Sequence, residues 1–171
     1  MNIEPSNFGV RIRMAAPDDA VSIASVLHES FVEYQSLYTR EGFAATTPAS
    51  DQIGNRMKEG PVWVATRDHA IIGTVSAVPQ ATGLYIRSMA ILPTARGLRI
   101  GELLLKQIES FAAERGCKRL FLSTTPFLSR AIRLYEHYGF RRSSEGPHDL
   151  FGTPLLTMEK DLESSDEECC V

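Results

Sequence analysis

The chain has 171 residues, 43% of them hydrophobic, and a formal net charge of −3 at pH 7. This length fits one domain with a short tail, and the hydrophobic content is enough to bury a core without disulfides. The slightly negative charge gives no basic footprint for nucleic acid, so we expect no nucleic-acid partner.

The cysteines and the two ends of the chain indicate a cytoplasmic protein. Cys117, Cys169 and Cys170 have neither the number nor the spacing of a disulfide framework or a zinc site, so we expect no metal. The first twenty residues contain no apolar core of a signal peptide, and no run of about 18 apolar residues occurs, so we expect no membrane partner. The acidic segment 163–171 is predicted to be a disordered tail, which leaves 8–162 as the domain.

The N-terminal third is predicted to contain one strand and two helices. Residues 10–14 alternate as in a strand, and Pro17 then marks a helix start. Residues 39–48 are predicted to be a loop, and 51–59 a second, shorter helix. The apolar stripe of the first helix, with three- and four-residue spacing, consists of Ala20, Ile23, Ala24, Leu27, Phe31 and Tyr34.

The middle of the chain predicts three strands, 62–67, 70–79 and 84–92, and Asp68-His69 is a hairpin turn between the first two. Since neighbouring strands usually pair, we expect an antiparallel meander. A helix from Gly97 to Gly116 should then return the chain to a strand parallel to the last of the three.

The C-terminal third is predicted to contain a strand at 118–124, a helix at 126–138 and two strands at 140–144 and 154–162, joined by a loop at 145–153. Thr124 or Thr125 is expected to cap the helix. The order is therefore β-α-α-β-β-β-α-β-α-β-β, a single α/β domain whose mixed, mostly antiparallel sheet is flanked by helices.

Residues 91–105, "ILPTARGLRIGELLL", place glycines and arginines immediately before a leucine-rich helix. A helix N-terminus presents unpaired N–H groups and partial positive charge. Gly97 and Gly101 would let a ligand approach the backbone, and Arg96 and Arg99 add charge. Phosphate or pyrophosphate suits this junction, although a simple glycine turn is an equally common source of such a pattern.

Two common phosphate-binding patterns are absent from the sequence. No G-x-x-x-x-G-K-[ST] of a P-loop occurs. A dinucleotide fold requires an acidic residue at the end of the next strand, and the strand "KRLFLST" has none.

The segment "AILPTARGLRIGELLL" resembles motif A of the GNAT family of N-acetyltransferases, in which R/Q-x-x-G-x-G/A follows a strand and opens the helix that holds the pyrophosphate of coenzyme A. Arg96 takes the first position and Gly101 the last. Arg99 replaces the middle glycine. We expect this replacement to be tolerated, because a residue in the first helical turn does not need a positive φ.

A second segment, "SRAIRLYEHYGF", resembles a later motif of the same family, N-x-x-A-x-x-L-Y-E-x-x-G-F, with Leu128 in the place of its asparagine. The resemblance covers residues 10–162. The matching positions are Ala131, Leu134, Tyr135, Glu136, Gly139 and Phe140.

The resemblance implies an enzyme that moves an acetyl group from acetyl-CoA directly to a primary amine of an unidentified acceptor. It assigns the general acid to Tyr135, which could instead be a packing residue, and it lets the backbone N–H of Ile91 polarise the acetyl carbonyl. A homodimer is common in this class. A non-catalytic acyl-CoA sensor or interaction module on the same fold is the alternative. The implied cofactor-binding residues are Met89, Ala90, Ile91, Arg96, Gly97, Leu98, Arg99, Ile100, Gly101 and Glu102.

Several candidates for the general base and the acceptor site stay open. Glu29 and Glu33 lie one helical turn apart, and His148 and Asp149 form a second pair; each pair could equally be exposed polar surface. A base acting through ordered water ranks first. Phe31, Tyr34 and Tyr38 could wall an acceptor pocket, but their helical spacing favours the core for the first two.

Overall fold

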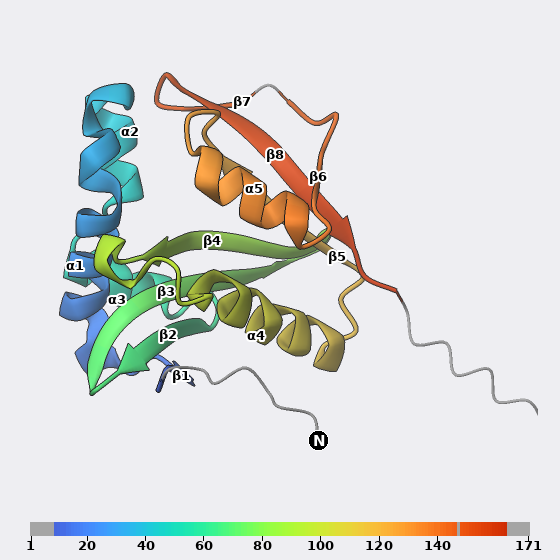
Figure 1. The fold of residues 1–171 in the computed structure, drawn as a ribbon. Helices are drawn as coiled ribbons and strands as arrows, with labels where there is room; N and C mark the ends of the chain where they lie inside the picture. The colour runs from blue at the N-terminus through green and yellow to red at the C-terminus, as the bar shows by residue number, and fades with distance from the viewer. Residues whose placement is uncertain (1–8, 147, 164–171) are drawn as a thin grey trace, which may run out of the picture.

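The computed structural model describes residues 9–146 and 148–163, in which one mixed sheet has helices on both faces (Figure 1). In chain order the elements are β1 (Arg11–Met14), α1 (Ala20–Phe31), α2 (Arg40–Thr46), α3 (Ser50–Arg56), β2 (Val62–Arg67), β3 (Ala70–Gln80), β4 (Gly83–Ile91), α4 (Ile100–Glu114), β5 (Arg119–Thr124), α5 (Ser129–His137), β6 (Arg141–Arg142), β7 (His148–Leu150) and β8 (Thr153–Asp161). The strand order is β1-β2-β3-β4-β5-β8-β6, and β7 pairs with β8.

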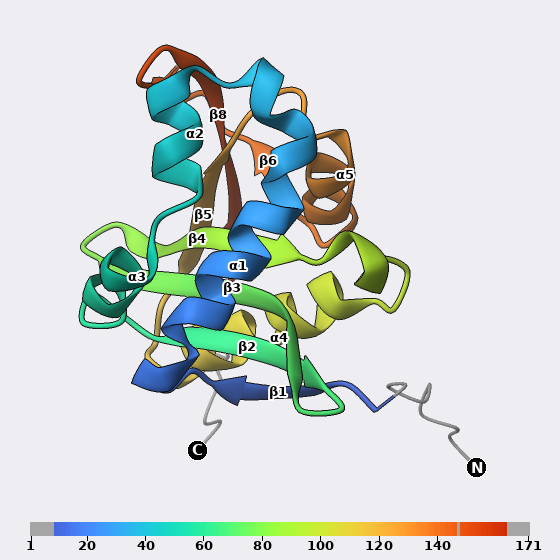
Figure 2. The same ribbon diagram turned by 90° about the vertical axis from the view of Figure 1, so that its left-hand side faces the viewer.

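The helices form two layers because the central strands are apolar on both sides. Val62 and Val64 of β2 pack with α1 and α3, and the intervening Trp63 packs on the α4 and α5 side. α1 crosses the sheet in front of β2, β3 and β4, and α4 lies behind these strands (Figure 2). The core is therefore split into two parts by the sheet.

The predicted meander and the parallel strand are confirmed. β2, β3 and β4 pair antiparallel in sequence, and β4 pairs parallel with β5. The hairpin turn at Asp68 and His69 is also confirmed, with φ values of 50° and 65° that suit a two-residue turn.

The loop predicted for residues 39–48 is wrong, because α2 lies there. The Thr39 hydroxyl accepts a hydrogen bond from the Gly42 N–H at 3.0 Å and so caps the helix. The Thr39 N–H in turn donates to Thr153 Oγ1 at 2.9 Å. The helix is stabilised by this contact with Thr153, which is distant in sequence, whereas the local sequence, with its threonines and Pro48, is typical of a loop.

Three smaller predictions are also corrected. The loop predicted at 145–153 contains the short strand β7. α1 ends at Phe31, and a 3-10 helix, Val32–Leu37, carries the rest of the predicted stripe. α5 begins at Ser129 rather than near Pro126, and no side chain caps it, so neither Thr124 nor Thr125 is its cap.

A β-bulge in β4 shapes the centre of the molecule. Thr74 of β3 pairs with Ala90, but Ser76 pairs with Arg87, so two β4 residues, Ser88 and Met89, lie opposite one. Ser88 adopts a φ of 55° to make this turn.

The two halves of the sheet diverge beyond this bulge. The β4–β5 pairing stops at Ile86 and Leu122, although both strands continue. In Figure 2 β2, β3 and β4 run across the view whereas β5 and β8 stand almost upright. The sheet therefore opens between β4 and β5, along the edge of β4 that faces β5.

Residues 164–171 of the predicted tail, including Cys169 and Cys170, lie outside the described residues. No helix among those at 9–146 and 148–163 has the length and hydrophobicity that a membrane span requires.

Candidate active site

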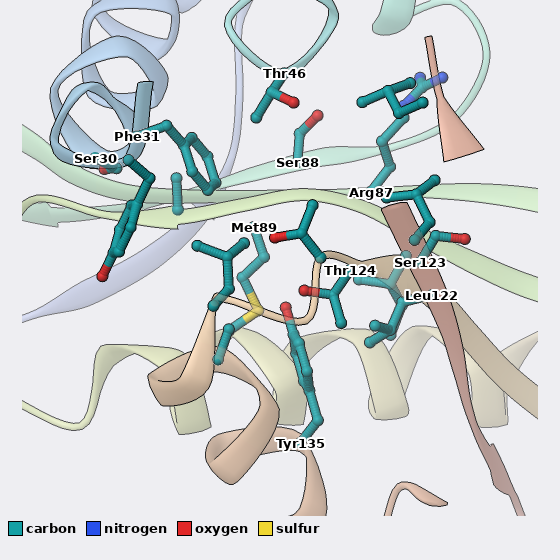
Figure 3. A pocket seen from close by; sticks show the side chains of 18 of the residues that line it. Ser30, Phe31, Thr46, Arg87, Ser88, Met89, Leu122, Ser123, Thr124 and Tyr135 are labelled. Atoms are coloured by element: carbon teal, nitrogen blue, oxygen red, sulfur yellow. The ribbon is translucent and has the colours of Figure 1, made fainter. Parts of the chain in front are cut away.

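A cavity of about 380 Å³ lies where β4 and β5 separate (Figure 3). β4 contributes residues 85–91 to its wall, and β5 with the residue after it contributes 122–125. Other wall residues come from α1, the 3-10 helix, α3 and α5. The cavity is therefore bounded by a stretch of β4 backbone without a paired strand and by side chains from both helix layers.

Tyr135 forms part of this wall from α5. Its side chain points into the cavity, between Met89 on one strand and Thr124 on the other (Figure 3). The residue is only 6% exposed, and its ring packs 5.8 Å from that of Phe140. Burial raises the pKa of the Tyr135 phenol above its ordinary value, so the hydroxyl keeps its proton at neutral pH.

Aromatic side chains cover the α1 side of the cavity. Phe31, Tyr34 and Tyr38 all line it, although the helical spacing placed the first two in the core. The rings of Tyr38 and Phe127 meet edge-on with centroids 4.9 Å apart. Because α1 gives way to a 3-10 helix after Phe31, the continuous helical stripe is lost and these rings face the cavity.

Two threonines at the C-terminal end of β5 also have a different role from the predicted cap. Thr124 and Thr125 are buried and line the cavity. The Thr125 hydroxyl oxygen is buried with no hydrogen-bond partner in the described part of the chain. These hydroxyls supply a polar strip on a wall that is otherwise apolar.

The junction before α4 borders one end of the cavity through Arg96. The Arg96 guanidinium forms an ion pair with Glu33 of the 3-10 helix. Gly97 has a φ of +89°, and a side chain built there would meet no atom within 4 Å. The loop is therefore open on the side that a phosphate would occupy.

The expectation for Arg99 is wrong. It is the N-cap of α4, with a left-handed φ of 59°, and not a residue of the first helical turn. The family's glycine suits that conformation without strain, whereas Arg99 bears a steric cost. Its guanidinium lies 2.9 Å from Glu102 Oε2 and remains 64% exposed.

Gly101 has a packing role in this structure. A Cβ at this position would lie 2.5 Å from Leu134 Cδ2 of α5 and 3.3 Å from both Ile91 Cδ1 and Met89 Cε. On the side where a Cβ would lie, the Gly101 backbone is therefore approached by a side chain of the second motif.

The β4 residues 89–91 present backbone to the cavity. Ala90 is paired with Thr74 of β3, and no β5 residue pairs with this part of β4 in the described chain. The Ile91 carbonyl accepts a hydrogen bond from the Ser30 hydroxyl at 3.0 Å.

The four acidic and histidine candidates do not line the cavity. Glu29 is an exposed residue of α1, and Glu33 is held by Arg96. His148 and Asp149 are exposed on β7, where the Asp149 carboxylate accepts from the Gly152 N–H at 2.7 Å and stabilises the turn. No Asp, Glu or His is present in the described wall, and residues 9–146 and 148–163 contain no cluster of three metal-ligating side chains.

Sequence reasoning missed three arginines of the wall, Arg56, Arg87 and the exposed Arg130. Arg56 donates to Ser88 Oγ at 2.8 Å and to the Ala45 carbonyl at 3.1 Å. The available signal was the pair "RS" at 87–88, which interrupts the apolar strand "LYIRSMAIL". Arg56, at the end of a short polar helix, gives no such signal.

Comparisons with known proteins agree with this geometry. A family model described as the acetyltransferase (GNAT) family matches residues 23–140. The uncharacterized N-acetyltransferase YjgM of Escherichia coli K12 is 30% identical over 145 residues, which cover 81% of this chain and 85% of that protein. The probable N-acetyltransferase camello of Xenopus laevis is 34% identical over 141 residues, covering 77% of this chain and 64% of that protein.

Among solved structures, the PaiA N-acetyltransferase of Thermoplasma acidophilum, in complex with coenzyme A, has the same fold. The TM-score is 0.77 at 20% identity, with 90% of this chain and 99% of that one covered. The family model covers most of the chain, and the relatives found by sequence and by fold are N-acetyltransferases as well. The chain therefore belongs to the GNAT family of acetyltransferases.

Proposed function

We propose that this chain transfers an acetyl group from acetyl-CoA directly to a primary amine, with no covalent enzyme intermediate. The observation that carries the proposal is the cavity between β4 and β5, which extends from Arg96, beside α4, to Tyr135. Cys117 is a free thiol but does not line this cavity, which disfavours an acyl-cysteine route.

The diphosphate of coenzyme A is proposed to lie over residues 96–102. No side chain caps the N-terminal end of α4, so its first N–H groups are free to bind phosphate oxygens. The open space above Gly97 gives room for the ligand. The charges of Arg96 and Arg99 would strengthen the contact.

The pantetheine arm is proposed to lie along residues 89–91 in the manner of an added strand. β5 leaves this side of β4 unpaired in the described chain, so its backbone groups need partners. A backbone N–H of this segment, that of Ile91 in our proposal, would donate to the carbonyl oxygen as negative charge develops there.

In the proposed reaction the amine nitrogen attacks the thioester carbonyl, and the tetrahedral intermediate then releases the thiolate. Tyr135 donates a hydrogen bond to the departing sulfur. The pKa of a phenol is ordinarily above that of a thiol, and burial raises the pKa of Tyr135 further, so complete proton transfer to sulfur is uphill. Tyr135 therefore stabilises developing charge, and its contribution is modest.

Ordered water is the proposed acceptor of the proton that the amine loses. No carboxylate or imidazole is present in the described wall to take it directly. An unperturbed alkyl amine has a pKa near that of lysine, about 10.4. Turnover should therefore rise with pH through the neutral range as the uncharged amine becomes more abundant.

Two measurements on the purified chain test this function. Titration calorimetry with acetyl-CoA should show binding, and a broad panel of primary amines should include acceptors that release free thiol. Binding without any acceptor-dependent thiol release would favour the sensor function over the enzyme. Absence of binding would remove the function altogether.

A matched pair of glycine variants locates the cofactor. Gly97 and Gly116 both have left-handed φ values, +89° and +66°, and both would place a new side chain in open space at opposite ends of α4. We expect Gly97→Glu to weaken acetyl-CoA binding by about tenfold or more, because the new carboxylate would repel the diphosphate and its side chain would occupy the same space. Gly116→Glu should bind like the wild type. Equal affinities for the two variants would refute the assignment of the diphosphate to this loop.

A further inference from the structure

Two arginines, Arg56 and Arg87, lie at the end of the cavity remote from Tyr135. Arg56 is the last residue of α3, and Arg87 precedes the β4 bulge. Figure 3 shows Arg87 and Ser88 on one side of Met89 and Tyr135 on the other. Since the proposed cofactor site approaches from Arg96, this arginine pair belongs to the half of the cavity that is left for the acceptor.

The positive charge of this pair is only partly compensated. Arg87 Nη2 lies 2.7 Å from Glu59 Oε2, but the contact lacks hydrogen-bond alignment, and Arg87 Nε has no partner in the described chain. Glu59 is 48% exposed, so this contact contributes little. Within residues 9–146 and 148–163, Arg56 donates hydrogen bonds only to the neutral oxygens of Ser88 and Ala45. Among the described residues, Arg87 thus contacts one carboxylate and the charge of Arg56 has no ion-pair partner.

The rest of the described wall supplies no further compensation, because it contains no Asp, Glu or His. Burial, with the nearby charge of Arg87, lowers the pKa of the Arg56 guanidinium. An anion bound beside the pair would relieve this unfavourable interaction.

We propose that the acceptor is a small amino carboxylate, whose carboxylate lies against Arg87 and Arg56 while its amine faces Met89 and Tyr135. This inference rests on the proposed acetyl transfer and names the substrate class. Arginine suits a carboxylate because its donors form charge-assisted, forked hydrogen bonds. The apolar wall at Tyr38, Leu150 and Leu155 would hold the carbon skeleton.

Matched acceptors test the carboxylate directly. One series consists of L-leucine, L-leucinamide and 3-methylbutylamine, and a second of 6-aminohexanoate, 6-aminohexanamide and hexylamine. In at least one series we expect the acid to have the highest kcat/KM, by about tenfold or more. In the leucine series this preference would be opposite to the intrinsic reactivity. The amine of L-leucinamide is less basic than that of L-leucine, so a larger fraction of it is uncharged and able to attack at neutral pH.

Variants of the wall provide the second test. Arg87→Gln and Arg56→Gln should each lower the ratio of kcat/KM for the acid to kcat/KM for its amide by about tenfold or more. Arg67→Gln removes an arginine at the exposed end of β2, away from the cavity, and should leave that ratio unchanged. Retained acetyl-CoA binding shows that each variant is folded.

A binding measurement makes the test independent of turnover. With coenzyme A present, N-acetylleucine or N-acetyl-6-aminohexanoate should bind the wild type more tightly than its carboxamide. If the amides and amines that lack a carboxylate were used as well as the acid or better in both series, the carboxylate site would be overturned and acetyl transfer left intact. Failure of every amine to release thiol would overturn the proposed function and this inference with it.

Discussion

Gly101, in the first turn of α4, lies directly against Leu134 of α5, so that a methyl group at Gly101 would come within 2.5 Å of Leu134 Cδ2. This contact joins the two motifs of the sequence in space. It lets α5 approach α4 and the end of β4 closely enough for Tyr135 to reach the cavity.

Gly101→Val should therefore lower the free energy of unfolding by about 1–3 kcal/mol, because the added methyls overpack this contact. Chemical denaturation measures the change. Gly54 of α3 is a matched control, since a side chain there would meet no atom within 4 Å, and Gly54→Val should cost far less. Leu134→Ala in the Gly101→Val background should recover part of the loss, and strict additivity of the two changes would contradict the contact.

Tyr135→Phe should reduce kcat by about tenfold to a hundredfold, the value of a hydrogen bond to a charged group. The variant keeps the ring and its packing on Phe140, so acetyl-CoA affinity by calorimetry should stay within a small factor of wild type. Tyr138→Phe is the control on the same helix end, because Tyr138 does not line the cavity. Equal turnover of the wild type and Tyr135→Phe would remove the tyrosine from the reaction.

Stability should fall steeply in alkaline solution. Burial raises the pKa values of Tyr135 and Tyr38 in the folded protein above the unfolded value of about 10. The contribution of these two protonated phenols to the free energy of unfolding is therefore fully present below pH about 10. Above this pH the contribution of each phenol falls by about 1.4 kcal/mol per pH unit until the phenol ionises in the folded protein. Denaturation of the wild type and Tyr135→Phe at several pH values between neutral and strongly alkaline measures this. If the dependence of the free energy of unfolding on alkaline pH were the same in Tyr135→Phe, the pKa of this phenol would not be raised by folding.

The ion pair of Arg96 with Glu33 should compete with the proposed diphosphate for the same guanidinium. We expect Glu33→Gln to strengthen acetyl-CoA binding up to about fivefold, the range of an exposed ion pair, and to leave kcat within about threefold. Arg96→Gln should weaken binding instead. A hundredfold loss of kcat in Glu33→Gln would instead identify this carboxylate as the general base.

Much of the fold could be predicted because it depends on local patterns. The β2–β3 hairpin follows from alternation on either side of Asp68-His69, and α4 follows from its leucine stripe. The helix α2 could not be predicted in this way, since its capping residue Thr39 is fixed by a hydrogen bond to Thr153 across the molecule. The left-handed Arg99 was missed for a related reason: the sequence gives the composition of the loop but not the residue at which the helix begins.

The segment proposed to bind the cofactor, 89–102, is continuous and has a recognisable spacing, so the sequence points to it directly. The proposed acceptor side is assembled from separate elements, among them α3, β4 and the 3-10 helix, and Arg56 is joined to it by the hydrogen bond to Ser88 at the β4 bulge. Glu29, His148 and Asp149 have suitable chemistry, but the fold places them outside the wall.

The divergence of β4 from β5 leaves strand backbone unpaired without creating a new edge of the sheet. Unpaired strand backbone usually lies at the rim of a sheet, where it can recruit strands of other chains and promote aggregation. Here the unpaired stretch lies in the interior of the sheet, flanked by β3 and β5, with helices above and below it. These unpaired groups are therefore reached through the cavity and do not form an exposed edge of the sheet. A small guest can use them without the protein presenting the open rim that favours strand addition.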